Sequence, residues 1–396
     1  MKYSPVLDRL ASLGSAKWKV HYAAADLAAH GRDVIDLTIG NPDVPAPAEL
    51  LEAAAAAMNA GRTQYSTGRG EPVLRAALAA RYEARAGRAV HPEQVLCFPG
   101  TQTALYAVLN GLTEPETEVL VADPMYATYE AVIRSSGAVP VAVPLREANG
   151  FRLAADDLAA RVTPRARAIL LNTPHNPTGA VLSPAEVAAI GEVARAHDLW
   201  IVSDEVYEEL VFDGTTFASP FDRAELAERT VVVSSISKSH AAPGFRSGWA
   251  VMSPDCAERL LPLSETMLFG NQPFIADATA AAVARPSTAA AGMRARFAAR
   301  ARALAERLGK ETCLRVHRPD AGMFALVEVS SSGLDDRAYA MDLLEATGVA
   351  VMPGTSFGQT LAGWVRVALT ADDARFREAC DRIVAHAAPR RARVRA

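Results

Sequence analysis

The stretch "AILLNTPHNPTGAVLSPAEVAAIGEVARAHDLWIVSD", residues 168–204, holds two apolar runs separated by a helical segment. The runs 168–172 and 200–204 are apolar almost throughout, which is typical of strands covered on both faces of a sheet. Between them, Ser183 precedes a proline and stands three residues before a glutamate, a pattern that caps the start of a helix. A strand, a helix and a second strand in this order predict a parallel pair joined by a crossover.

The same alternation of apolar β-branched runs and alanine-rich helical segments extends from about residue 95 to 251. We therefore expect an α/β fold whose large domain has a seven-stranded, mostly parallel sheet between helices. After about residue 285 strand-like and helical segments follow in mixed order, which predicts a smaller α+β domain. The five further runs of the large domain are 95–98, 119–123, 139–143, 230–234 and 248–252.

Charge and cysteine content limit the possible functions. A formal net charge of −4 gives no electrostatic basis for binding nucleic acid or an anionic membrane, and no apolar run approaches the roughly 18 residues of a membrane span. The four cysteines form no CxxC pair, so neither a metal site nor a disulfide framework is expected. We expect a cytoplasmic protein that acts on small molecules.

Polar residues follow the ends of the apolar runs. In open parallel sheets, ligands bind beyond the carboxyl ends of the strands, where the loops converge. Each of these residues has an ordinary interpretation when taken alone, as a helix cap, a packing aromatic, a turn former or half of a surface ion pair. Because all of them are expected at the same edge of the sheet, a cofactor site is favoured instead. They are Gly100, Thr101, Gln102, Tyr126, Asn176, Asp204, Tyr207, Ser235, Lys238 and Arg246.

Lys238 is unusual because arginine supplies nearly all of the positive charge. Only five of the 41 basic residues are lysines, and Lys238 is the only one between Lys19 and Lys310. A guanidinium stays protonated and cannot attack a carbonyl, whereas a lysine amine forms a Schiff base. We interpret Lys238 as a nucleophile for a carbonyl cofactor.

Pyridoxal phosphate needs the kinds of groups that surround Lys238 in the sequence. A carboxylate keeps its ring nitrogen protonated, phenol and amide donors stabilise its ring oxygen, and a helix start with an arginine holds its phosphate. Asp204 matches the first requirement, and Tyr207 with Asn176 matches the second. The phosphate ligands are expected to be Gly100, Thr101, Gln102, Ser235 and Arg246.

With these motifs in order along nearly its whole length, the chain resembles the fold-type I pyridoxal-phosphate aminotransferases of class I/II, the aspartate aminotransferase-like family. The motifs that carry the resemblance are "TIGNPD" (38–43), "YSTGRGEPVLRAALAARY" (65–82), "PGTQTAL" (99–105), "DPMYATY" (123–129), "NTPHNPTG" (172–179), "SDEVYEEL" (203–210), "SISKSHAAPGFRSGW" (235–249) and "GWVRVAL" (363–369).

The resemblance implies further roles. Lys238 is the lysine that binds the cofactor and moves the substrate proton, and Tyr126 is the aromatic that stacks on the ring. Arg366 is the arginine that binds the substrate carboxylate, near Gly40 and Asn176. Tyr65 reaches the phosphate of a neighbouring subunit, which implies a homodimer with shared active sites.

The resemblance also implies the domain limits. The large cofactor-binding domain is expected at 46–285, and 286–396 forms the C-terminal part of the small domain. Residues 1–45 form an N-terminal segment that joins the small domain.

Within the family, phrases such as "AKWKVHYAA" (16–24) are most similar to arginine–pyruvate transaminases. The implied reaction moves the α-amino group of an L-amino acid, arginine or another basic or neutral donor, to a 2-oxo acid such as pyruvate by a ping-pong Schiff-base mechanism. A β-lyase or an amino-acid oxidase or hydroxylase on the same fold stays open, because the sequence does not fix the substrate pose against Lys238. A non-catalytic effector domain is not expected.

Several positions bear on the choice of substrate without identifying it. Thr101 stands where some dicarboxylate-selective members have lysine, which speaks against aspartate as the preferred donor. The 267–273 loop departs from the family pattern, so its contact with the partner's cofactor stays open. Asp26 and Asp43 are candidates for a guanidinium and equally for surface charges. Trp18, His21 and Tyr22 belong either to the pocket mouth or to an N-terminal framework.

Overall fold

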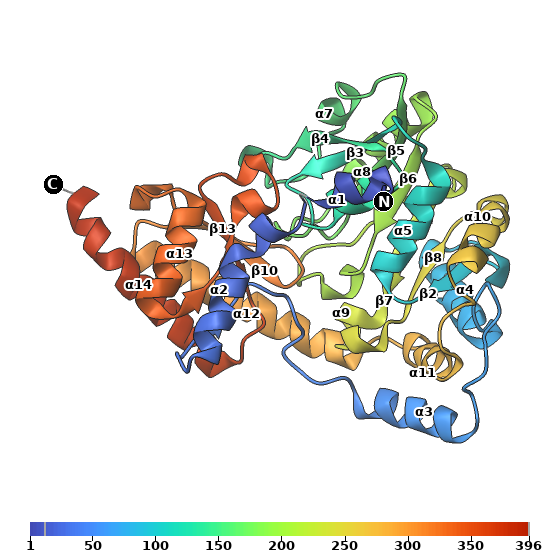
Figure 1. Ribbon diagram of the computed structural model, residues 1–396, viewed down its shortest axis with the longest axis horizontal. Helices are drawn as coiled ribbons and strands as arrows, with labels where there is room; N and C mark the ends of the chain where they lie inside the picture. The colour runs from blue at the N-terminus through green and yellow to red at the C-terminus, as the bar shows by residue number, and fades with distance from the viewer. Residues whose placement is uncertain (12, 395–396) are drawn as a thin grey trace.

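The computed structural model describes residues 1–11 and 13–394, and a seven-stranded sheet forms its larger part (Figure 1). The strand order is β2-β8-β7-β6-β5-β3-β4. Strand β8 runs antiparallel to both of its neighbours, and the other neighbouring pairs are parallel, which confirms the predicted sheet. The strands are β2 (Val95–Phe98), β3 (Glu118–Asp123), β4 (Val139–Pro144), β5 (Ala166–Asn172), β6 (Trp200–Asp204), β7 (Thr230–Ser235) and β8 (Gly248–Val251).

Helices cover both faces of this sheet because its strands present apolar side chains to both sides. On β3, Val119 and Val121 belong to the core under α5, α6 and α10, whereas Leu120 belongs to the core under α7 and α8. Helices α3, α4 and α11 pack on a further apolar cluster that includes Val232 and Trp249. These helices are α3 (Ala48–Asn59), α4 (Pro72–Ala86), α5 (Thr101–Leu112), α6 (Tyr129–Ser135), α7 (Ala155–Ala159), α8 (Pro184–Ala196), α10 (Pro254–Met267) and α11 (Pro273–Val283).

Helix α8 begins at the signal that the sequence contains. The Ser183 hydroxyl accepts a hydrogen bond from the Glu186 backbone N–H at 3.2 Å, and the Glu186 carboxylate accepts one from the Ser183 N–H at 2.8 Å. Val187 and Ile190 are buried against the sheet. This crossover brings β5 and β6 side by side with Asn172 opposite Asp204, so two polar residues meet at the carboxyl edge.

A second group of elements lies at the other end of the molecule, around α13 and α14 (Figure 1). Its antiparallel sheet has the order β12-β13-β10-β9. The strands are β9 (Arg315–His317), β10 (Phe324–Glu328), β12 (Met352–Pro353) and β13 (Trp364–Ala368). Helices α2 (Lys19–Ala29), α12 (Thr288–Glu311), α13 (Asp336–Thr347) and α14 (Asp373–Val394) belong to the same group.

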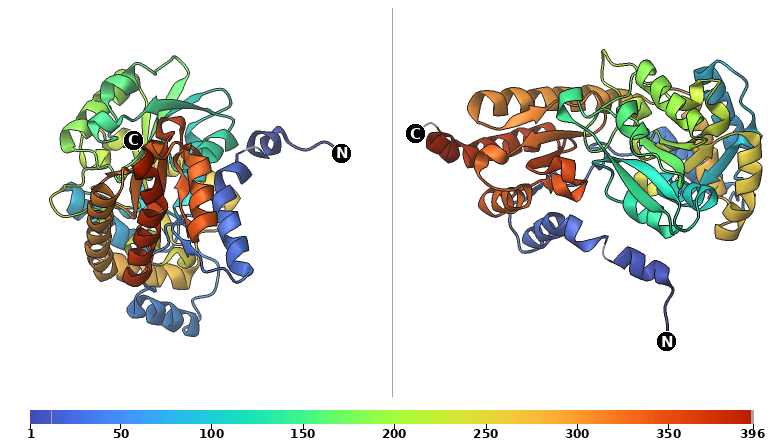
Figure 2. Two further views of the ribbon diagram at one scale, coloured as in Figure 1. Left: turned by 90° about the vertical axis from the view of Figure 1, so that its left-hand side faces the viewer. Right: turned by 90° about the horizontal axis from the view of Figure 1, so that it is seen from above.

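The N-terminal segment packs on this second group. Strand β1 (Ile35–Asp36) pairs in parallel with β11 (Val349–Ala350), and Val20 and Leu37 share one apolar core with α12, α13 and α14. Figure 2 shows the start of the chain, with α1 (Pro5–Ala11), extending away from the rest of the molecule. The domain limits at residues 45 and 285 stay a proposal, which this shared core supports. Within the described part of the chain, no helix is both long and apolar enough to cross a membrane.

Candidate active site

A pocket of about 280 Å³ lies at the carboxyl ends of β5, β6 and β7, between the large sheet and strand β13. Its wall includes residues from both groups of elements and from the segment between β1 and α3. The predicted residues that line it are Gly40, Thr101, Gln102, Tyr126, Asn176, Asp204, Tyr207, Ser235, Lys238, Arg246 and Arg366.

Two predicted residues lie outside this wall. Gly100 precedes α5, and a side chain there would collide with the Arg246 guanidinium; its φ of +89° also favours glycine. Tyr65 lies elsewhere on the same chain, 90% exposed and in edge contact with the ring of Phe269 at 5.9 Å. Glycine at position 100 therefore lets the arginine approach the start of α5.

Lys238 lies in the short helix α9 (Ile236–Ser239), directly after β7. Its amine donates a hydrogen bond to the Gly40 carbonyl at 2.6 Å. Burial, together with the positive charges of Arg366 and Arg246, lowers the pKa of the Lys238 amine to about 8. The folded environment therefore disfavours the ammonium form and favours the neutral, nucleophilic amine.

Asp204 is a buried carboxylate at the end of β6. It accepts hydrogen bonds from the Tyr129 hydroxyl at 2.7 Å and from the Val206 backbone N–H at 3.2 Å. Burial raises the pKa of Asp204 to about 6, and these hydrogen bonds partly oppose the increase. A carboxylate held in this way is suited to pairing with a buried cationic nitrogen of a ligand.

Arg366, on β13, is a buried cation without an acidic partner among the described residues. Its guanidinium donates to the Asn176 side-chain oxygen at 3.0 Å and to the Thr38 carbonyl at 2.5 Å, and its Nε has no partner. The guanidinium carbon lies 3.9 Å from the ring centre of Phe324 and 4.3 Å from that of Phe357. Burial lowers the pKa of Arg366 to about 10. A buried, uncompensated arginine favours an anionic ligand.

The N-terminus of α5 forms a second place for an anion. The Thr101 hydroxyl is buried and makes no hydrogen bond with any residue that the structure describes, and the Arg246 guanidinium lies within 3.2 Å of the Pro99 carbonyl, two residues before the helix. Free backbone N–H groups at a helix start, a hydroxyl and an arginine together suit a phosphate group. The unpaired Thr101 hydroxyl and the Arg246 guanidinium at the start of α5 fit the phosphate end of pyridoxal phosphate. Lys238 and Asp204 line the same pocket.

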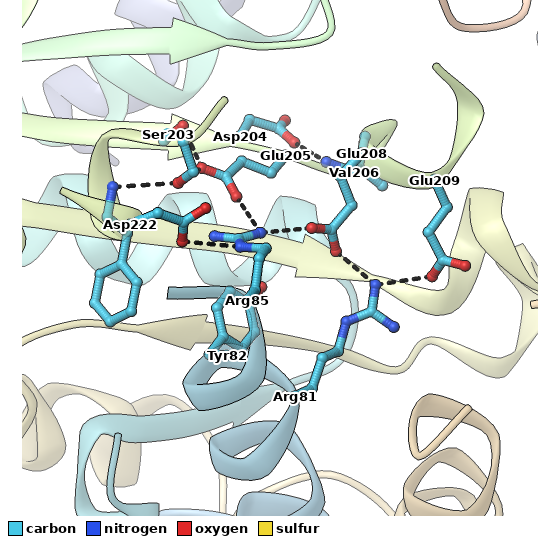
Figure 3. A network of polar contacts seen from close by, with 12 residues as sticks. Arg81, Tyr82, Arg85, Ser203, Asp204, Glu205, Val206, Glu208, Glu209 and Asp222 are labelled. Atoms are coloured by element: carbon cyan, nitrogen blue, oxygen red, sulfur yellow. Dashed lines mark hydrogen bonds and ion pairs between the residues drawn. The ribbon is translucent and has the colours of Figure 1, made fainter. Parts of the chain in front are cut away.

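A polar network holds the segment that follows Asp204 (Figure 3). Arg85, from α4, donates to Glu205 at 2.9 Å, to Glu208 at 2.5 Å and to Asp222 at 2.9 Å. Arg81 joins Glu208 to Glu209 at 2.8 Å each. Burial raises the pKa of Glu205 to about 7. The network fixes the short helix η4 (Glu208–Leu210) next to Tyr207.

Some site residues were missed from the sequence. Tyr129 follows Tyr126 by three residues, so that both face the pocket from the start of α6, and this spacing was a usable signal. Asn172 ends β5, and its side-chain oxygen accepts from the Asn176 N–H at 2.8 Å. Phe324 and Phe357 carry no local signal, because only the folding of β10 and of the loop before β13 brings them against Arg366.

The structure also shows where the N-terminal residues that had two possible roles lie. Trp18 lines the pocket, the His21 ring nitrogen lies 2.8 Å from the Thr38 hydroxyl, and Tyr22 is 60% exposed.

The side chain of Asp43 is buried and paired with Arg296 and Arg300, at 2.8 and 2.7 Å. Asp26 is largely exposed beside His30. Neither aspartate lines the pocket, so neither meets a substrate guanidinium within one chain.

Comparisons with known proteins agree with this arrangement. The sequence model of the family described as "Aminotransferase class I and II" matches residues 32–383. An arginine–pyruvate transaminase of Pseudomonas aeruginosa is 43% identical over 388 residues, which cover 98% of each chain. An aspartate/prephenate aminotransferase of Cereibacter sphaeroides is 34% identical and covers 92% of this chain and 94% of the relative. The structure of Thermus thermophilus aspartate aminotransferase with maleate has a TM-score of 0.90 at 31% identity, covering 97% of this chain and 99% of that one.

Proposed function

The chain belongs to the class I and II aminotransferase family and is a pyridoxal-phosphate-dependent transaminase, and from this premise we propose its substrates and the roles of its residues. It moves the α-amino group of an L-amino acid, arginine or another basic or neutral donor, to a 2-oxo acid such as pyruvate. The observation that carries the proposal is the placement of Lys238 and Arg366 in one pocket: an amine of lowered pKa and a buried arginine without a carboxylate partner among the described residues.

The residues that would hold the cofactor follow from the pocket. Thr101, Ser235 and Arg246, with the start of α5, would bind the phosphate, and Gly100 leaves the space for the Arg246 guanidinium. Asp204 holds a proton at the ring nitrogen, and Tyr207 with Asn176 donates to the ring oxygen. Tyr126 packs on the ring. When bound, the cofactor supplies an aldehyde that accepts amines and a ring that withdraws electrons.

The substrate is positioned by its carboxylate. Arg366 forks onto the α-carboxylate, and the Phe324 and Phe357 rings keep the guanidinium away from water. Asn176 and Thr38 hold the arginine in place through the two hydrogen bonds that they accept. In its neutral form the Lys238 amine would take the proton from the substrate α-carbon and later return it. The two half-reactions alternate in a ping-pong sequence.

The substrate side chain meets a mostly neutral wall. Among the lining residues that the structure describes, Asp204 is the only carboxylate, and Tyr129 holds it on the cofactor side. Thr101 offers no cation for the distal carboxylate of aspartate. Trp18, Ile39 and Asn41 line the pocket and suit a long aliphatic or neutral side chain. The similarity to a protein named arginine–pyruvate transaminase supports arginine as the donor.

A single-turnover screen tests the donor. The holoenzyme is mixed anaerobically with each L-amino acid, and conversion of the cofactor to its amine form is followed by absorbance, with the D-enantiomers as controls. We expect a neutral amino acid to react at least about tenfold faster than aspartate, since a missing charge partner costs about 1.4 kcal/mol or more. The similarity to the arginine–pyruvate transaminase leads us to expect the same advantage for arginine or lysine. Fast conversion by aspartate would overturn the donor assignment. Release of ammonia or pyruvate without an added 2-oxo acid would show a lyase or oxidase instead.

The working assembly is proposed to be a homodimer in which Tyr65 serves the neighbouring active site. Tyr65 and Phe269 are exposed apolar side chains in mutual contact beside a cleft that also includes Asn271, whose side-chain amide is buried without a partner among the described residues. An exposed aromatic pair next to an unpaired buried amide is typical of a surface that a second copy covers. The cytoplasmic location stays a prediction from the cysteine usage.

A further inference from the structure

A second cavity, of about 230 Å³, lies away from the active site between helix α12 and the loops that follow η4 and β9. We call it the arginine cavity, because Arg294 and Arg302 of α12 and Arg318 of the loop after β9 all line it. The face of α12 that borders it places alanines between the two arginines. These small side chains leave the space between the guanidinium groups open.

The three arginines of the cavity differ from most arginines of this chain. Arg296 and Arg300, on the opposite side of α12, are paired with the buried Asp43 at 2.8 and 2.7 Å. Arg294, Arg302 and Arg318 make no side-chain hydrogen bond or ion pair with any described residue. From Arg9 to Arg382, the only other arginine side chains without such a partner are Arg285 and Arg377, which do not line this cavity.

Positive charge is therefore in excess in the cavity. Asp213 and Asp320 also line it, but no ion pair joins either carboxylate to an arginine within the described residues, and the formal sum of the five charged side chains is +1. Guanidinium groups bind phosphate and carboxylate oxygens in bidentate fashion. Three of them around one hollow, with only two carboxylates in its lining, leave an excess of positive charge that an anion can balance. We propose that the arginine cavity binds a small polyanion that carries at least two phosphate or carboxylate charges.

The position of the cavity predicts what binding would do. One wall belongs to the loop that continues from Tyr207 and η4, and the other belongs to α12 and the loop before β10. The two walls already touch, because the Phe212 N–H donates to the Asp320 carbonyl at 2.9 Å and Val211 forms a β-bridge with Ala321. An anion held by arginines of both walls would clamp them together and stabilise the folded holoenzyme.

Calorimetric titration of the holoenzyme tests the proposal, with citrate as the carboxylate probe and inorganic phosphate as the phosphate probe. Acetate at equal ionic strength serves as the monoanion control. We expect saturable binding of citrate or phosphate with a rise in melting temperature, and the stronger of the two identifies the ligand chemistry. The absorbance of the bound cofactor should not change, since the site lies outside the active site.

A comparison of two arginine variants makes the result specific. The triple variant R294Q/R302Q/R318Q should weaken binding about tenfold or more, whereas R285Q/R377Q, which removes the unpartnered arginines outside the cavity, should leave it unchanged. If the triple variant does not fold, R302Q and R318Q alone should each weaken binding, because both residues are exposed. Binding that is absent in the wild type, or equal in the wild type and these cavity variants, would overturn the proposal.

Discussion

At the scale of single residues, the pocket contains two cations whose environments give them opposite uses. Burial and neighbouring positive charge bring the pKa of Lys238 down to about 8, so that roughly a fifth of its amine is neutral near pH 7.4, far more than for an ordinary lysine. Arg366, with its pKa at about 10, stays charged even though it is buried. One cation is therefore suited to act as a nucleophile and base, and the other to act as a permanent carboxylate ligand.

The residues that the sequence placed in the site are those whose chemistry is specific to one side chain. Lys238 is a lysine in an arginine-rich chain, and Asp204 ends a buried strand where an acid is costly. Asn172 and Tyr129 escaped prediction because their roles depend on register and on helix orientation, which place them against Asn176 and Asp204. Asp43 was left open as a guanidinium ligand, and its partners proved to be Arg296 and Arg300, which are far from it in sequence.

At the scale of elements, the strand, helix and strand at 168–204 could be predicted because hydrophobic period and capping are local properties. The antiparallel direction of β8 could not, since only its pairing with β2 and β7 determines it. The ion pairs that join α4 to the segment after Asp204 could not be predicted from the sequence either, because more than a hundred positions separate Arg85 from its three carboxylate partners.

The Arg85 network allows a prediction at this scale. Arg85→Met leaves Glu205 and Asp222 without a cation and Glu208 with Arg81 alone. We expect the free energy of unfolding at pH 7 to fall by about 3–5 kcal/mol, as for a buried ion pair that loses one partner. Urea unfolding of the holoenzyme at a fixed protein concentration measures this loss.

The pH dependence of this loss follows from the carboxylates. Burial already raises the pKa of Glu205 to about 7, and removing Arg85 raises it further. A carboxyl whose pKa is raised by folding stabilises the folded state as pH falls, so the loss should be largest at pH 8 and smaller at pH 5. Arg195→Met, which breaks an exposed pair with Glu192, is the control and should cost about 0–1 kcal/mol. A small, pH-independent effect for Arg85→Met would contradict the network's proposed role.

At the scale of the whole molecule, two parts of the chain that are distant in sequence build one site. The N-terminal segment returns to the second group through the β1–β11 pair, and this places Thr38 and Gly40 against Arg366 and Lys238. Long-range pairing of two-residue strands leaves no periodic signal. The resemblance, rather than local pattern, supplied this expectation.

One substitution tests whether the protein is a homodimer. Phe269 is 66% exposed and in contact with Tyr65, so Phe269→Asp would place a charge in the proposed dimer interface. We expect sedimentation to show the wild type at about 84 kDa, twice the chain mass of 42.0 kDa, and the variant at the monomer mass. The variant should also bind pyridoxal phosphate more weakly, because the neighbouring Tyr65 is lost. Phe269→Tyr, which keeps the ring, should remain dimeric; a monomeric and fully active wild type would refute the shared site.

The central claim is that Lys238 is the amine on which the transamination depends. Lys238→Arg keeps the positive charge but removes the nucleophile and the proton carrier. Borohydride reduction followed by peptide mass spectrometry, with turnover measured on the same samples, tests the claim most directly. The wild type should retain the cofactor covalently on Lys238, and the variant should bind it without a covalent link and lose turnover. Retained turnover in Lys238→Arg, or a cofactor reduced onto another lysine in the wild type, would contradict the account.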